Sequence, residues 1–247
     1  MFSKLANLQT FIKIIKEEYG NRVAYRYLVD DQIVEKTFAE LAKDAKSIAS
    51  WMVQNGYHGR HIAIIGATSY HWITTFLGIT GSANVVVPVD RMLSEKEIMN
   101  ILEMGDVELV FVSEEFEYLL DSIEQNENKN MMVIPFSGEC FQEILHTIPA
   151  ILPKIESEWL AEILFTSGTT GISKGVMISH RNISANLTEY YRMNILDNIK
   201  CEPVAMSVLP IHHTYELTIG HLGMLYRGIT ICINDRLENI VLNLNRF

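Results

Sequence analysis

The sequence contains few cysteines, and their arrangement suggests neither a disulfide framework nor a zinc site. Only Cys140, Cys201 and Cys232 occur in 247 residues, and they are odd in number and widely spaced. Small secreted domains use even sets of cysteines at short intervals, and zinc knuckles use close pairs. We therefore expect a protein of a reducing compartment, the cytoplasm.

An excess of basic residues is also lacking. Twenty Lys and Arg residues are outnumbered by 30 Asp and Glu residues, which gives a formal net charge of -10. Such a surface repels nucleic acid and anionic membranes, so we expect neither as a general partner. A local anion site is still compatible with this charge, because backbone N–H groups, one lysine and a metal ion reverse the field at a single place.

The segment from His61 to Val89 contains no Asp, Glu, Lys or Arg, although its length alone would suggest a membrane-spanning helix. Interspersed Gly, Ser, Thr, Asn and Pro residues divide it into strand, helix and strand. Continuously apolar strands are typical of a parallel sheet covered on both faces. The first 16 residues have apolar positions at helical spacing rather than the unbroken apolar run of a signal peptide. We expect no integral membrane segment in the chain.

What the sequence does contain is a regular alternation of strand and helix patterns. A hairpin with arms at 23–29 and 33–36 is predicted to turn at Asp30-Asp31. Thr37 with Glu40, and Ser94 with Glu97, have the spacing of capping boxes that begin helices. Further strands are predicted at 61–66, 85–89, 108–112, 131–134, 162–165, 175–178, 203–209 and 229–233, and helices at 70–80, 98–104, 115–123, 141–147, 180–192 and 217–226. This alternation indicates an α/β fold with mostly parallel sheets flanked by helices.

A dense polar segment lies between the apolar runs 163–165 and 176–178. Its glycines allow successive N–H groups to converge on an anion, its hydroxyls can bind phosphate oxygens or Mg²⁺, and Lys174 adds a mobile positive charge. The candidate nucleotide-binding residues are Thr166, Ser167, Gly168, Thr169, Thr170, Gly171 and Lys174, of which Thr170 is also the candidate metal ligand.

Neither of the two commonest nucleotide loops fits this segment. A Walker A loop requires Gly directly before the lysine and Ser or Thr after it, whereas Ser173 precedes Lys174 and Gly175 follows it. The dinucleotide-binding pattern Gly-x-Gly-x-x-Gly is absent from the segment. An ordinary polar surface turn is the common interpretation of Gly, Ser and Thr between strands, but the density of such residues here favours a binding loop.

A second polar segment, Ile211-His-His-Thr-Tyr-Glu216, follows the strand predicted at 203–209. The carboxyl ends of strands are where α/β proteins bind ligands, so His213 and Glu216 are candidate substrate-binding residues. The same two side chains could instead pair with each other across one helical turn. Metal ligation by His212 and His213 is not expected, because adjacent side chains diverge and no third ligand is evident.

Both segments resemble those of one family. The run Thr166-Ser-Gly-Thr-Thr-Gly-Ile-Ser-Lys-Gly-Val176 resembles the signature loop of the adenylate-forming (AMP-binding) superfamily, although Ser173 stands where the family usually has proline. The run Leu209-Pro-Ile-His-His-Thr-Tyr-Glu216 is similar to the histidine motif of long-chain fatty-acid acyl-CoA synthetases. The resemblance implies a ligase that uses ATP and Mg²⁺ to convert a carboxylic acid, expected to be a fatty acid, into an acyl-adenylate. The acyl group then passes to a thiol, that of CoA or of a carrier protein.

The resemblance also implies roles for individual residues. Lys174, Thr170 and His213 would be catalytic, the loop would hold the β- and γ-phosphates, and His213 would orient the acid's carboxylate beside Glu216. An amino-acid or aryl-acid adenylating domain, and a non-catalytic nucleotide-binding or acyl-binding module, are the alternatives.

The layout of the chain resembles the front of these enzymes as well. It implies that residues 1–247 form the amino-terminal part of the large domain, with a first α/β portion at 1–157 and the two polar segments at 158–247. Family members are longer and continue into a carboxyl-terminal domain with a catalytic lysine, which is missing from this sequence. We therefore expect the 247-residue chain alone to be inactive.

Overall fold

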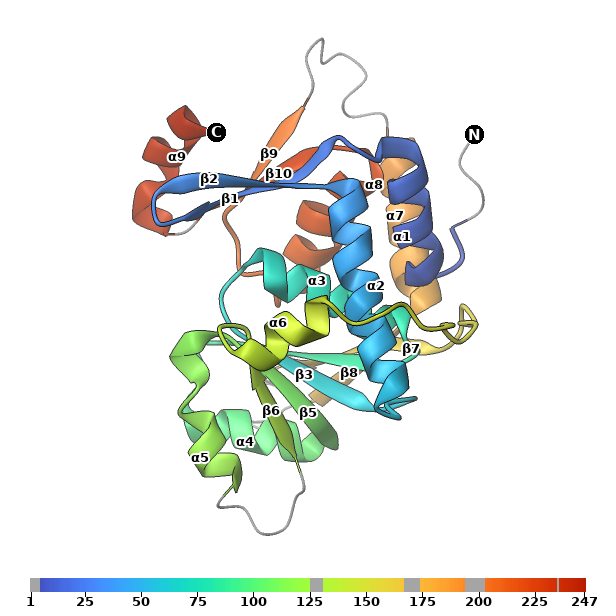
Figure 1. Cartoon of the computed structure of the whole chain (residues 1–247), viewed down its shortest axis with the longest axis vertical. Coiled ribbons are helices and arrows are strands. Elements are labelled where there is room, and N and C mark those ends of the chain that lie inside the picture. Colours follow the sequence, from blue (N-terminus) through green and yellow to red (C-terminus); the bar gives the residue numbers. More distant parts are fainter. Residues whose placement is uncertain (1–4, 125–130, 167–173, 194–202, 235) are drawn as a thin grey trace. The chain divides into compact units, whose positions relative to one another are not determined.

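A computed structural model describes residues 5–124, 131–166, 174–193, 203–234 and 236–247. The chain forms two compact units, each assembled from separate stretches of sequence (Figure 1). Unit 1 comprises Met1–Lys43, Thr68–Tyr70 and Arg181–Phe247, and unit 2 comprises Asp44–Ala67 and His71–His180. Among the described residues, no helix combines the length and the apolarity needed to cross a bilayer.

Unit 2 is built on a six-stranded sheet. Its strands are β3 (His61–Ile65), β4 (Val85–Val89), β5 (Val107–Val112), β6 (Met132–Pro135), β7 (Leu160–Thr166) and β8 (Lys174–Ser179). Their order is β6-β5-β3-β4-β7-β8, and every neighbouring pair is parallel except the antiparallel hairpin of β7 and β8. The α/β fold with mostly parallel strands is therefore confirmed.

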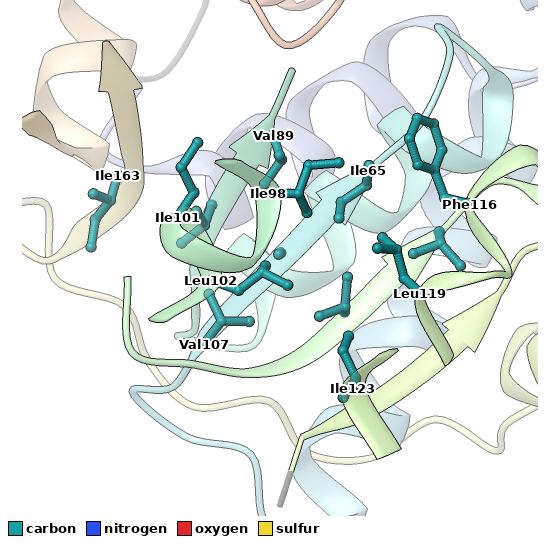
Figure 2. Close-up of a cluster of buried hydrophobic side chains, with 14 of the residues drawn as sticks. Ile65, Val89, Ile98, Ile101, Leu102, Val107, Phe116, Leu119, Ile123 and Ile163 are labelled. Atoms are coloured by element: carbon teal, nitrogen blue, oxygen red, sulfur yellow. The ribbon is translucent and has the colours of Figure 1, made fainter. Parts of the chain in front are cut away.

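The central strands β3, β4 and β5 are buried on both faces. On one face, α4 (Glu95–Met104) and α5 (Leu119–Glu124) contribute Ile98, Ile101, Leu102, Leu119 and Ile123 to a cluster with alternate residues of β3, β4 and β5 (Figure 2). The intervening residues Ile62, Ile64, Val86, Leu109 and Phe111 are also fully buried. Burial on both faces explains why the segment from His61 to Val89 contains no Asp, Glu, Lys or Arg residue.

The other helical elements that belong wholly or mostly to unit 2 are α2 (Phe38–Gln54), α3 (Tyr70–Gly81), the 3-10 turn η1 (Glu114–Phe116) and α6 (Glu139–Leu145). Gly78 lets α3 pack closely on α2, because a Cβ atom there would lie 2.5 Å from Cγ2 of Ile48. The single helix predicted at 115–123 is wrong in part, since η1 and α5 are separate elements.

Unit 1 contains a four-stranded sheet in the order β2-β1-β10-β9. The strands are β1 (Val23–Val29), β2 (Gln32–Thr37), β9 (Val204–Ser207) and β10 (Thr230–Ile233). The antiparallel hairpin of β1 and β2 turns at Asp30 and Asp31, whose φ angles are 48° and 62°. Two-residue hairpin turns require this left-handed backbone, which aspartate tolerates better than most residues, so the predicted hairpin is confirmed.

The helices of unit 1 include α1 (Leu8–Tyr19), most of α7 (His180–Arg192), α8 (Met224–Tyr226), the 3-10 turn η3 (Leu237–Asn239) and α9 (Ile240–Arg246). The start of α7 at His180 is as predicted. The apolar helix predicted at 217–226 differs in type: residues Glu216–Gly223 form a π-helix, η2, that continues into α8. Apolar periodicity does not distinguish these two kinds of helix over so short a segment.

The capping boxes are confirmed. In the first, the N–H and hydroxyl of Thr37 donate to the Glu40 carboxylate, and the Glu40 N–H donates back to Thr37 Oγ1. In the second, Ser94 Oγ donates to Glu97 Oε2 at 2.6 Å, and the Glu97 N–H donates to Ser94 Oγ at 3.4 Å. The hydrogen bonds to Thr37 lower the pKa of Glu40.

Replacing Ser94 with alanine should lower the free energy of unfolding by about 1 kcal/mol, because the first turn of α4 loses its side-chain acceptor. Urea unfolding followed by circular dichroism measures this loss. Ser113→Ala is the matched control, since the buried Ser113 hydroxyl has no hydrogen-bond partner among the described residues. An equal loss in both variants would contradict the capping interpretation.

Candidate active site

The predicted phosphate loop connects β7 to β8. Thr166 and Lys174 are directly opposite each other in the antiparallel register, and both are exposed. Opposite residues project from the same face of a sheet, so the two side chains start from neighbouring positions on one face of the hairpin. The other candidate residues of the loop, Ser167, Gly168, Thr169, Thr170 and Gly171, lie outside the described residues, as does the proposed metal role of Thr170.

Lys174 forms no ion pair with any residue that the structure describes. Its ammonium group is therefore available to an external anion. Gly175 follows it within β8, where a Cβ atom would lie 3.0 Å from Cγ2 of Ile163. Glycine at this position therefore leaves room for the Ile163 side chain of the neighbouring strand β7.

An unexpected carboxyl group lies below the loop in β7. Glu162 is 1% exposed, and its Oε1 has no hydrogen-bond partner among the described residues. Burial raises the pKa of this group from 4.5 to about 7, because the charged form loses its hydration. In the sequence, Glu162 is only a single glutamate within an apolar strand pattern. Sequence reasoning therefore did not identify it as a candidate site residue.

The histidine segment forms the turn that leads into η2. The His213 N–H donates to the Pro210 carbonyl at 3.1 Å, and the His213 carbonyl accepts from the Leu217 N–H at 3.0 Å. The His213 side chain is exposed, whereas that of His212 is buried. His213 is thus presented to solvent from a turn whose backbone is fixed on both sides.

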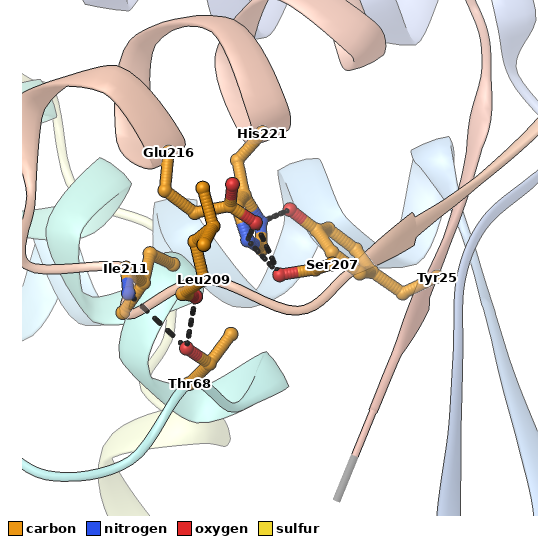
Figure 3. A network of polar contacts seen from close by, with 7 residues as sticks. All are labelled: Tyr25, Thr68, Ser207, Leu209, Ile211, Glu216 and His221. Carbon is orange, nitrogen blue, oxygen red and sulfur yellow. Dashed lines mark hydrogen bonds and ion pairs between the residues drawn. The ribbon is translucent and has the colours of Figure 1, made fainter. Parts of the chain in front are cut away.

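Thr68 fixes the chain just before this turn. Its Oγ1 accepts from the Ile211 N–H at 3.2 Å and donates to the Leu209 carbonyl at 3.4 Å (Figure 3). One side chain thereby satisfies two backbone groups of an irregular segment, which stabilises its path.

Glu216 is buried and turned towards β9 rather than towards His213. Ser207 Oγ donates to Glu216 Oε1 at 2.6 Å and lies 2.9 Å from His221 Nε2. Tyr25 Oη lies 2.8 Å from His221 Nδ1, and Figure 3 shows the four side chains pointing at one another. The alternative in which His213 and Glu216 pair across a helical turn is wrong. Sequence reasoning missed Tyr25, Ser207 and His221, whose only signal was a polar group in an apolar strand or helix.

Burial dominates the electrostatics of this group. It lowers the pKa of His221 from 6.5 to about 3 and raises that of Tyr25 well above its ordinary value. Burial also raises the pKa of Glu216, and the hydrogen bond from Ser207 acts in the opposite direction. His221 is therefore a neutral imidazole throughout the physiological range of pH.

The comparison with known families identifies the family to which the β7–β8 hairpin and the histidine segment belong. The model of the AMP-binding enzyme family matches residues 14–243, a range that includes the hairpin of β7 and β8 and the histidine segment. The chain belongs to the AMP-binding enzyme family. The resemblance to adenylate-forming enzymes is thereby confirmed at the level of the family.

Known relatives in the family show how much of an enzyme the chain represents. A D-alanine–D-alanyl carrier protein ligase of Streptococcus pyogenes serotype M5 (strain Manfredo) is 29% identical over 154 residues, which cover 60% of this chain and 28% of that ligase. Among solved structures, the inhibitor-bound N-terminal domain of FACL13 from Mycobacterium tuberculosis has a TM-score of 0.84 at 21% identity. That match covers 97% of this chain and 60% of the FACL13 chain.

A fatty acyl CoA synthetase from Mycobacterium tuberculosis has a TM-score of 0.83 at 19% identity, with 98% of this chain and 48% of that one covered. The chain thus spans less than two thirds of the length of each of these three relatives. The two structural matches show that this family's amino-terminal fold extends over nearly all of the chain.

Proposed function

We propose that the protein containing this chain is an ATP-dependent acid–thiol ligase that activates a carboxylic acid as its acyl-adenylate. The observation that supports this most is the side-by-side placement of Thr166 and Lys174 at the two ends of the family's signature loop. An exposed hydroxyl and an ammonium group without an ion-pair partner among the described residues suit a polyphosphate.

In this proposal, the residues from Thr166 to Lys174 hold the β- and γ-phosphates of ATP while a carboxylate oxygen of the acid attacks the α-phosphorus. Pyrophosphate leaves with the negative charge that Lys174 stabilises, and His213 orients the attacking carboxylate. The chemistry depends mainly on positioning and charge stabilisation. The hydroxyl groups of the loop fit Mg²⁺, which prefers oxygen ligands and supplies further charge neutralisation when bound.

The acid is proposed to be a fatty acid, and the acceptor thiol that of CoA. The histidine motif with Glu216 and the fold of the two Mycobacterium tuberculosis structures support this choice. The Streptococcus pyogenes relative is named for D-alanine and a carrier protein, which supports an amino acid and a carrier-protein thiol as the alternative. We also propose that the chain is the amino-terminal part of the large domain of a cytoplasmic enzyme.

Acid-dependent exchange of labelled pyrophosphate into ATP tests the proposal in the natural protein that contains this chain. The panel would contain fatty acids of increasing length, an aryl acid and D-alanine, each with and without Mg²⁺. We expect exchange with at least one fatty acid, and acyl transfer when CoA is then added. Exchange with D-alanine alone would favour the carrier-protein alternative. Nucleotide binding without exchange for any acid would favour a non-catalytic module.

A further inference from the structure

Four buried polar side chains from three elements of unit 1 converge next to the histidine segment. Tyr25 comes from β1, Ser207 from the end of β9, and Glu216 and His221 from η2 (Figure 3). The residues are at most 5% exposed, and Tyr25 and His221 are completely buried. Residues far apart in the sequence therefore meet in an apolar interior, where an unsatisfied polar group is costly.

The π-helical geometry brings Glu216 and His221 together. In an α-helix, residues five apart point about 140° away from each other, given 3.6 residues per turn. The i→i+5 hydrogen bonding of a π-helix instead places them nearly above one another. Glu216 Oε1 and His221 Nε2 are 3.7 Å apart, and both reach Ser207. Gly220 leaves space for the carboxylate, because a Cβ atom there would lie 2.6 Å from Glu216 Oε2.

The number of protons in the cluster fixes the direction of its hydrogen bonds. Ser207 has one hydroxyl proton, and an ionised Glu216 can only accept it. Ser207 Oγ must then accept from His221, so the imidazole proton is on Nε2. Nδ1 is left as an acceptor for the Tyr25 hydroxyl. In this arrangement Tyr25 donates to His221, His221 donates to Ser207, and Ser207 donates to Glu216. Every proton therefore has an acceptor.

The reverse arrangement leaves one proton without an acceptor. If a protonated Glu216 donated to Ser207, Ser207 would donate to Nε2, and His221 would donate from Nδ1 to Tyr25. The Tyr25 hydroxyl proton would then have no acceptor among the described residues, although Tyr25 is completely buried. A buried hydroxyl proton without an acceptor destabilises the fold, which favours the first direction.

We propose that Tyr25, His221 and Ser207 are positioning residues whose one-directional hydrogen bonds hold Glu216 and thereby fix the first turn of η2 and the placement of His213. This inference rests on the proposed function, because His213 acts on the acid there. The connection is short: the His213 carbonyl accepts from Leu217, the residue next to Glu216. Thr68 holds the segment just before the turn, and the four-residue group holds the segment just after it.

The tautomer of His221 is the first test, and it requires only the chain itself. In ¹⁵N-histidine-labelled protein at pH 7, long-range ¹H–¹⁵N spectra should show a neutral imidazole with its proton on Nε2. The signal is assigned by its loss in His221→Gln. Tyr25→Phe should shift the Nδ1 resonance towards that of an acceptor without a hydrogen bond. A proton on Nδ1, or a charged imidazolium, would overturn the inference.

The second test is the pyrophosphate exchange of the natural protein. Tyr25→Phe and Ser207→Ala should each lower kcat about tenfold, which corresponds to the loss of about one hydrogen bond, with KM for ATP changed by less than about twofold. Ser207→Thr keeps the hydroxyl and should restore most of the rate. Tyr118→Phe, which removes a hydroxyl from a ring that is 46% exposed, is the control.

The outcomes separate the two proposals. A wild-type protein without exchange for any acid would refute the proposed function, and the positioning inference with it. An active wild type whose variants keep full kcat would refute the positioning inference alone, leaving a cluster that only stabilises the fold. Melting temperatures of all variants identify any that fail to fold, and the tautomer of the wild type decides the hydrogen-bond direction in that case.

Discussion

Lys174→Ala should lower the acid-dependent pyrophosphate exchange of the natural protein about 100-fold, the scale on which loss of one preorganised charge-stabilising group acts. The reason is geometric: Lys174 is fixed opposite Thr166 at the loop's end and has no ion-pair partner in the described part of the chain. In the proposed reaction, this charge would stabilise the departing pyrophosphate. The loss should appear mainly in kcat, because the charge on pyrophosphate develops as the bond to the α-phosphorus breaks.

Lys154→Ala is the matched control for this variant. Lys154 belongs to the same unit, its side chain is 87% exposed, and it pairs with Glu156 on the surface. Removing it changes the net charge by the same amount, so a general electrostatic effect would appear in both variants. Exchange by Lys174→Ala at the wild-type rate would contradict the role proposed for this lysine.

Glu162→Gln should raise the free energy of unfolding by about 3 kcal/mol at pH 8 and change it little at pH 4.5. Folding raises the pKa of Glu162 from 4.5 to about 7, so the folded chain binds more protons than the unfolded chain between these values. The stability that the wild type has at low pH is consequently lost as the pH rises through this window. At about 1.4 kcal/mol per pH unit, the loss amounts to about 3 kcal/mol, and the uncharged glutamine avoids it.

Urea unfolding of both chains at several pH values between 4.5 and 8 measures this difference. Because both are compared at the same pH, the titration of other buried groups, such as His221, cancels. Glu143→Gln removes an exposed carboxylate and should have little effect at either end of the range. A stabilisation that does not depend on pH would show that packing, rather than the charge of Glu162, is responsible.

Elements with strong local signals could be predicted from the sequence. The hairpin turn at Asp30 and Asp31 and the capping boxes of Thr37 and Ser94 depend on residues within a few positions of one another, so their residue types suffice to identify them. The parallel sheet followed from the uncharged apolar strands between His61 and Val89. The loop and the histidine segment were recognisable because their unusual residues are contiguous.

Features that depend on distant residues could not be predicted. The hydrogen bond between Tyr25 and His221 joins side chains 196 positions apart, and nothing near either residue indicates the other. The π-helix is linked to this contact, since its widened turn lets Glu216 and His221 share Ser207. Glu162 looked like any strand residue, because its burial is determined by neighbouring strands rather than by its own sequence.

The parallel pairing of β1 with β10 has a consequence for the order of events during synthesis. Arg22, the residue before β1, donates from its side chain to the carbonyl of Gly228, 206 positions later. At roughly 5 to 20 residues per second, the ribosome needs about 10 to 40 s to make the intervening chain. Throughout that time the inner edge of the amino-terminal hairpin has unpaired backbone groups, which attract other nascent chains. The hairpin therefore stays without its neighbour β10 in the sheet for most of the synthesis of the chain.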